Sequence, residues 1–128
     1  MGVRIVQLGS PREPDEGVRI GTVRRPPRGV PKAEFASQNY YDIWLPNLAP
    51  SAELVALAKS ATSNAHWDRF VREYRAQMNM PDARRLLDLL AVFSKSTNFS
   101  VGCYCKEENR CHRSVLRRLL EERGATIK

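Results

Sequence analysis

Cysteine and histidine are scarce in this sequence, and long apolar runs are missing altogether. The 128 residues include 3 cysteines and 2 histidines. No apolar stretch approaches the roughly 20 residues that a helix needs to cross a bilayer. The first six residues carry one charge and no apolar core, so they do not resemble a secretory signal. We therefore expect a cytoplasmic protein without a membrane partner, in which the cysteines are reduced thiols.

Acidic residues are outnumbered by basic ones, 14 against 21, which gives a net charge of +7. Between Arg19 and Lys32 there are five cations and no acid. This excess favours an anionic partner: a phosphate-bearing small molecule, a nucleic acid or an acidic protein face. No helix-turn-helix pattern, finger spacing or aromatic RNA-binding motif is present. A nucleic-acid or acidic-partner binding module without catalysis is therefore the alternative to a small-molecule site. Nothing in the sequence indicates a cofactor or an oligomeric state.

Short runs of β-branched and aromatic residues predict four strands, bounded by turn signals. These runs are Val3–Leu8, Val18–Val23, Tyr40–Leu45 and Phe99–Tyr104. The first two runs are too close for a helical crossover, which favours an antiparallel pair. Residues 125–127 are compatible with an additional edge strand.

Apolar residues at helical spacing predict four helices. The first helix starts after the N-cap Ser51, and the second runs from about Trp67 to Met78. The third starts at Pro81, and the fourth runs from about Arg110 to Gly124 with Asn109 as its N-cap. Strands separated by helices are typical of an α/β fold. We expect one small domain over residues 1–128, with a mixed, mainly parallel sheet flanked by helices.

All three cysteines lie within nine residues, at the junction of a predicted strand and a predicted helix. They are Cys103, Cys105 and Cys111, and His112 follows directly. In an α/β sheet such a junction lies at the carboxyl edge, where ligands bind and where helix N–H groups attract anions. Four interpretations stay open: small buried core residues, a zinc site that includes His112, a reactive thiolate with the C-x4-R spacing of Cys105 and Arg110, and a Cys103–Cys111 redox pair.

The main hypothesis is an anion-binding, thiol-dependent site at this edge of the sheet. Arg24 and Arg28, in a proline-stiffened loop, would clamp the anion together with Arg113. Cys103 or Cys111 would supply the nucleophile, and a neutral His112 would act as base. This hypothesis includes no metal, and it leaves open whether the protein is an enzyme. A structural zinc-binding domain is a further alternative.

Three segments of the sequence match a known family pattern. They are Pro27-Arg28-Gly29-Val30, the run Trp44-Leu45-Pro46-Asn47-Leu48-Ala49-Pro50-Ser51, and Cys103 followed by Cys111-His112-Arg113-Ser114. The chain thereby resembles the YeaO-like proteins, domain of unknown function 488, from about Val18 to Gly124. It departs from the family where Val23 and Asn47 replace common aspartates and where Pro26 replaces a tryptophan. The resemblance implies a bacterial, cytoplasmic α/β domain and no established reaction.

Overall fold

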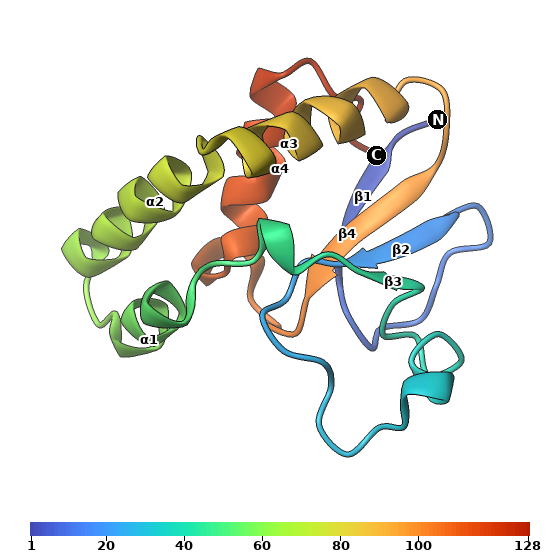
Figure 1. Cartoon of the computed structure of the whole chain (residues 1–128), viewed down its shortest axis with the longest axis horizontal. Coiled ribbons are helices and arrows are strands. Elements are labelled where there is room, and N and C mark those ends of the chain that lie inside the picture. Colours follow the sequence, from blue (N-terminus) through green and yellow to red (C-terminus); the bar gives the residue numbers. More distant parts are fainter.

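Four parallel strands form the central sheet of the computed structural model, which describes residues 1–128 (Figure 1). They are β1 (Val3–Gln7), β2 (Val18–Gly21), β3 (Ile43–Trp44) and β4 (Phe99–Cys103). Their order across the sheet is β1-β4-β2-β3. Phe99 of β4 pairs with Val3 on one side and Val18 on the other. The predicted α/β fold is confirmed.

The expected antiparallel pairing of the first two strands is wrong. β4 lies between β1 and β2 and runs parallel to both. All five residues of β4 are buried, and this continuous buried run suits the centre of a parallel sheet rather than its edge. Because β1 and β2 run in the same direction, the connecting loop must carry the chain back from the carboxyl to the amino edge of the sheet.

Four α-helices gather on one side of the sheet, with α4 packed against β1 and β4 (Figure 1). They are α1 (Ala52–Ser60), α2 (Asn64–Met78), α3 (Pro81–Phe93) and α4 (His112–Glu122). Ser51 and Ser63 cap the first two helices by accepting hydrogen bonds from the N–H groups of Leu54 and His66. The prediction that Asn109 is the N-cap of the last helix is wrong. Asn109 lies in a short 3-10 turn, η3 (Glu108–Arg110), so Cys111 becomes the N-cap.

The third strand and the C-terminal tail are shorter than expected. Only Ile43 and Trp44 of the predicted run at 40–45 pair with β2. The ring of Tyr41, just before them, lies against Gly21 instead. In the tail, Ile127 makes a single parallel bridge to Val3 rather than a full strand. No helix is both long and apolar enough to cross a bilayer.

Two hydrophobic clusters fill the interior. The larger lies between the sheet and the helices and includes Val101, Phe70 and Leu116. The smaller lies at the carboxyl edge of the sheet, and we call it the edge cluster: Leu8, Val23, Tyr41, Cys103 and Cys111. Two of the predicted site residues are therefore part of the packed interior.

Candidate functional site

The two buried cysteines bracket the loop that joins the sheet to the last helix. β4 ends at Cys103, and α4 begins directly after Cys111. Between them, residues 104–110 form a polar loop that includes the exposed Cys105. The parallel sheet places this loop at its carboxyl edge, as the sequence predicted.

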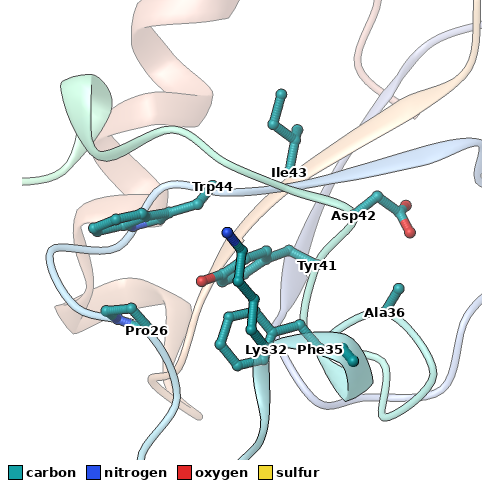
Figure 2. Close-up of a pocket in the computed structure, with 9 residues that line it drawn as sticks. Pro26, Lys32, Phe35, Ala36, Tyr41, Asp42, Ile43 and Trp44 are labelled. Atoms are coloured by element: carbon teal, nitrogen blue, oxygen red, sulfur yellow. The ribbon is translucent and has the colours of Figure 1, made fainter.

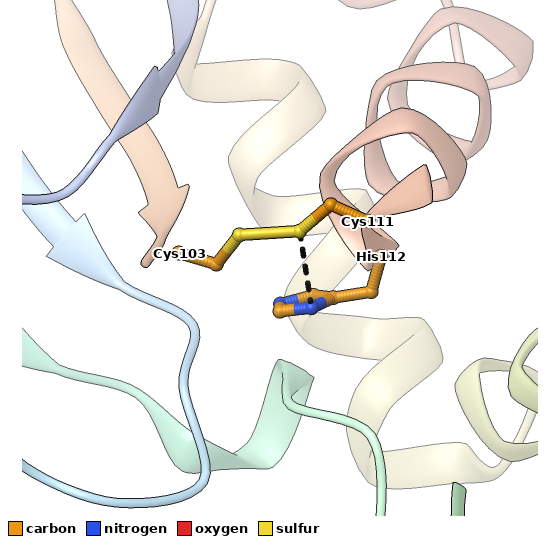
Figure 3. Close-up of side chains that lie close together, drawn as sticks. All are labelled: Cys103, Cys111 and His112. Carbon is orange, nitrogen blue, oxygen red and sulfur yellow. Dashed lines mark hydrogen bonds between the residues drawn. A yellow bond between two sulfur atoms is a disulfide. The ribbon is translucent and has the colours of Figure 1, made fainter. Parts of the chain in front are cut away.

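The sulfur atoms of Cys103 and Cys111 are joined as a disulfide (Figure 3). Cys103 is 1% exposed and Cys111 2% exposed. Their Cα atoms are 7.9 Å apart, beyond the roughly 4.4–6.8 Å usual for cysteines in a disulfide. Of the four interpretations that the sequence leaves open, the redox pair agrees with this contact, whereas the expectation that these two cysteines are reduced thiols does not. Because both are buried, neither sulfur is open to a substrate in this arrangement.

His112 turns its imidazole toward the sulfur pair (Figure 3). Nε2 lies 2.7 Å from the carbonyl oxygen of Thr22, to which it must donate its hydrogen. Nδ1 therefore carries the lone pair of the neutral ring, and it lies 3.8 Å from Sγ of Cys111. Burial lowers the pKa of His112 to about 4; the carbonyl of Thr22 opposes this shift and Arg113 adds to it. The imidazole is neutral at pH 7, with its lone pair toward sulfur.

Thr22 is a site residue that the sequence reasoning missed. Its carbonyl accepts from His112, and its hydroxyl donates to the carbonyl of Gly102 at 2.9 Å. Both carbonyls are backbone atoms, which every residue type has, so the sequence does not indicate these two contacts. The alternating pattern predicts only that Thr22 lies in or near a strand.

Arg113 does not face solvent. It is 4% exposed, and its Nη2 donates to the carbonyl oxygens of Cys105 at 2.5 Å and Lys106 at 3.3 Å. Burial lowers the pKa of its guanidinium. Nε has no partner within the protein. Arg113 thus holds the cysteine-bearing loop in place. These contacts are with the protein's own carbonyl groups, and its predicted role in clamping an anion stays a prediction.

Residues 24–28, which we call the arginine loop, lie next to the cysteine segment, residues 103–111, although about eighty residues separate the two in the sequence. Besides the contact of Thr22 with His112, the hydroxyl of Tyr104 donates to the carbonyl of Arg25 at 2.8 Å. The side chains of Arg24 and Arg28 are exposed, and neither forms an ion pair or hydrogen bond within the protein. Both guanidinium groups are therefore free to meet an anion.

The structure bears differently on two other interpretations of this loop, the C-x4-R oxyanion site and the metal site. Arg110 donates to Asn64 at 2.6 Å and lies over the ring of Trp67, so it points to α2 rather than toward Cys105. This removes the basis for a C-x4-R oxyanion loop. For a metal, one ligand atom from each of Cys103, Cys111 and His112 lies within 4.8 Å of the others, whereas Cys105 is outside this group.

Comparison with known proteins agrees with this picture. A family model described as the active DUF488-N3 subclade matches residues 3–124, which include every strand, every helix and the cysteine–histidine cluster. No curated protein and no solved structure matches the chain. The function of the DUF488 family is not established. The chain belongs to the DUF488-N3a family, which includes the YeaO-like proteins.

Proposed function

We propose that the protein binds an anionic small molecule at the carboxyl edge of its sheet, and that Cys103 and Cys111 are the thiol centre of this site. The contact of the sulfur pair with His112 carries the proposal, and the loop that bears Arg24 and Arg28 is joined to the cysteine segment by the hydrogen bond from Tyr104 to Arg25. Arg24 and Arg28 supply positive charge that no carboxylate of the protein neutralises. Guanidinium forks suit phosphate and carboxylate groups.

The thiol chemistry is an exchange with a small disulfide such as oxidised glutathione. Nδ1 of His112 takes the proton of the Cys111 thiol, and the thiolate attacks the small disulfide and releases one of its halves as a thiolate, which takes that proton. Cys103 then attacks the mixed disulfide, which forms the Cys103–Cys111 bond and releases the second half as a thiol. Two cysteine thiols are oxidised and one small disulfide is reduced. Because both sulfurs are buried, this exchange requires the 104–110 loop to move away from them.

Counting thiols tests the redox part. After reaction of the reduced protein with one equivalent of oxidised glutathione and labelling with a maleimide under unfolding conditions, we expect one labelled cysteine per chain, Cys105. After treatment with excess dithiothreitol and labelling under unfolding conditions, we expect three. Three labelled cysteines after both treatments would show that the pair does not form a disulfide in solution.

Anion binding is tested with pyrophosphate as the probe, by isothermal titration calorimetry. The double variant Arg24→Gln/Arg28→Gln should bind about tenfold more weakly, because two charge-assisted contacts are lost. Arg84→Gln/Arg85→Gln, at two exposed and unpaired arginines of α3, removes the same charge as a matched control and should not change the affinity. Equal weakening in both would mean that only the net charge matters, and unchanged binding in Arg24→Gln/Arg28→Gln would remove these arginines from the site.

Zinc binding is a second candidate for the same cluster. His112 donates Nε2–H to a backbone carbonyl and leaves Nδ1 for an ion, the arrangement found for most metal-ligating histidines. Two cysteines and one histidine are also zinc ligands of suitable type, and one ligand atom of each lies within 4.8 Å of the others. Elemental analysis of protein purified with a phosphine reductant decides: about one zinc per chain, lost in Cys111→Ser, supports this candidate, and a zinc-free protein with a reversible disulfide excludes it.

A further inference from the structure

A pocket of about 610 Å³ opens beside β3, and Tyr41, which also belongs to the edge cluster with the two cysteines, lines it. Its volume falls within the roughly 300–1,000 Å³ of small-molecule sites. Figure 2 shows the side chains that line it. The lining is mostly apolar and includes Pro26, Phe35, Tyr41 and Trp44, together with the charged Lys32 and Asp42.

Tyr41 contributes a buried hydroxyl that the protein itself does not satisfy. The residue is 4% exposed, and its hydroxyl oxygen has no hydrogen-bond partner. The ring is fixed by the close approach of Gly21 and by an edge contact with Phe35 at 5.3 Å between ring centroids. In Figure 2 the hydroxyl is directed toward the space between Trp44 and Pro26. A buried polar group without a partner is costly, so this one is expected to meet a ligand.

The free charge of the pocket is positive. Both carboxylate oxygens of Asp42 accept from Arg12, at 2.8 and 3.1 Å, so this acid is neutralised. Lys32 lines the pocket and forms no ion pair or hydrogen bond within the protein. The exposed arginines of the adjoining loop add charge of the same sign. The pocket therefore complements an anion.

Trp44 offers a flat, partly open face. Its indole N–H donates to the carbonyl of Val23 at 2.7 Å, which fixes the plane of the ring. The residue is 41% exposed although it is large and apolar. A held aromatic ring at the mouth of an apolar pocket is a platform on which another ring can stack.

We propose that this pocket binds a planar aromatic ring that carries a phosphate or carboxylate group. The ring lies against Trp44, the hydroxyl of Tyr41 donates to a ring or ester acceptor, and the anionic group lies at Lys32. Burial raises the pKa of Tyr41, which keeps the hydroxyl protonated and able to donate. The inference rests on the proposed anion binding at this edge of the sheet and names the class of ligand.

Calorimetric titration with four probes separates the parts of the inference. Adenosine 5′-monophosphate carries ring and phosphate, adenosine only the ring, ribose 5-phosphate only the phosphate, and 1-naphthoate a ring with a carboxylate. We expect at least one of the two aromatic anions to bind about tenfold or more tightly than adenosine and ribose 5-phosphate. Which of the two binds more tightly identifies the anionic group.

Failures of this inference and of the proposed function look different. If ribose 5-phosphate binds as tightly as the monophosphate, the aromatic class is wrong and anion binding stands. If adenosine binds as tightly as the monophosphate, the role of Lys32 is wrong. If neither aromatic anion, ribose 5-phosphate nor pyrophosphate binds, both proposals are overturned.

Two variants locate the binding site. Tyr41→Phe removes one oxygen and keeps the ring packing, and it should weaken binding of the preferred probe about fivefold, as expected for one hydrogen bond. Lys32→Gln should weaken it about tenfold, whereas Lys59→Gln, at an exposed lysine of α1, should not. Circular dichroism confirms that each variant is folded. Full affinity in both Tyr41→Phe and Lys32→Gln would show that the probe binds elsewhere.

Discussion

Arg19 is a fully buried charge, and its contacts explain how the fold tolerates it. Nε and Nη2 bind the two carboxylate oxygens of Glu16 at 2.7 and 2.9 Å. Nη1 donates to the carbonyls of Ser10 and Asn39 at 2.9 and 2.7 Å. Ser100 of β4 donates to the same carboxylate at 2.7 Å. This network ties the loop after β1 and the segment before β3 to the face of the sheet opposite the helices.

Removing the charge of Glu16 should therefore be costly. Glu16→Gln leaves Arg19 buried without a counter-charge, and we expect the free energy of unfolding to fall by about 3–5 kcal/mol. Urea denaturation measures the change. Glu13→Gln, on the same loop but exposed, should stay within about 0.5 kcal/mol of the parent. A similar small change for Glu16→Gln would mean that the ion pair contributes little to stability.

The same carboxylate makes stability depend on pH. Burial alone raises the pKa of Glu16, but the hydrogen bonds from Arg19 and Ser100 outweigh it and hold the pKa below the usual 4.5. Its contribution to stability is therefore complete above pH 4.5 and is lost as the pH falls through the folded-state value. Ser100→Ala removes one of these bonds and should move acid unfolding, followed by circular dichroism, to higher pH. An unchanged or lower midpoint would contradict this account.

At the scale of elements, two paired glycines shape the carboxyl edge of the sheet. Gly21 of β2 and Gly102 of β4 lie side by side in the register. A Cβ atom on Gly102 would lie 2.6 Å from the backbone oxygen of Val6 and 2.9 Å from the side chain of Leu8. A Cβ atom on Gly21 would meet the ring of Tyr41. The missing side chains are the reason that Leu8 and Tyr41 can close over the strand ends and form the edge cluster.

Gly102→Ala should thus destabilise the sheet by about 1–3 kcal/mol through overpacking against backbone. Gly29→Ala is the comparison, because its Cβ meets nothing within 4 Å and only its positive φ of 73° opposes the change. Thermal or urea unfolding should rank Gly102→Ala as the more destabilised variant. The reverse order would show that the edge of β4 can shift to accept a methyl group.

The strands and helices were predictable because each depends on local patterns: β-branched runs, serine caps and apolar spacing. Strand order was not, because the central position of β4 depends on pairings between residues nearly a hundred positions apart. For the site, Cys103, Cys111 and His112 were found together because they are neighbours in the sequence. The burial of Arg113 was not predicted, because the sequence does not show that its guanidinium group donates to the carbonyl groups of the 104–110 loop.

At the scale of the whole molecule, the C-terminal tail closes one edge of the sheet. The N–H of Val3 donates to the carbonyl of Thr126 at 2.9 Å, and the N–H of Lys128 donates back to the carbonyl of Val3 at 2.8 Å. Ile127 packs against the larger hydrophobic cluster. The opposite edge, at β3, has no such cover and carries the exposed Ile43.

Deleting residues 125–128 should lower the melting temperature, because the two backbone hydrogen bonds to β1, the hydrogen bond from Ala125 to Leu120 and the packing of the partly buried Ile127 are lost together. A loss of about 2 kcal/mol corresponds to roughly 5–15 °C for a chain of this size. Lys128→Ala removes the ion pair with Asp15, which is exposed to solvent and therefore contributes little to stability. Differential scanning calorimetry should separate the two variants clearly. Equal melting temperatures would mean that the tail does not stabilise β1.

Because the tail runs beside β1, the two ends of the chain lie near one another at the amino end of the strands (Figure 1). The arginine loop, the cysteines and the aromatic pocket all lie at the other end. A biosensor chip or an affinity tag attached at either terminus would therefore leave the ligand-facing surface unobstructed. The same proximity makes the chain suited to circular permutation, in which a short glycine linker joins the present ends and new ones are opened in an exposed turn.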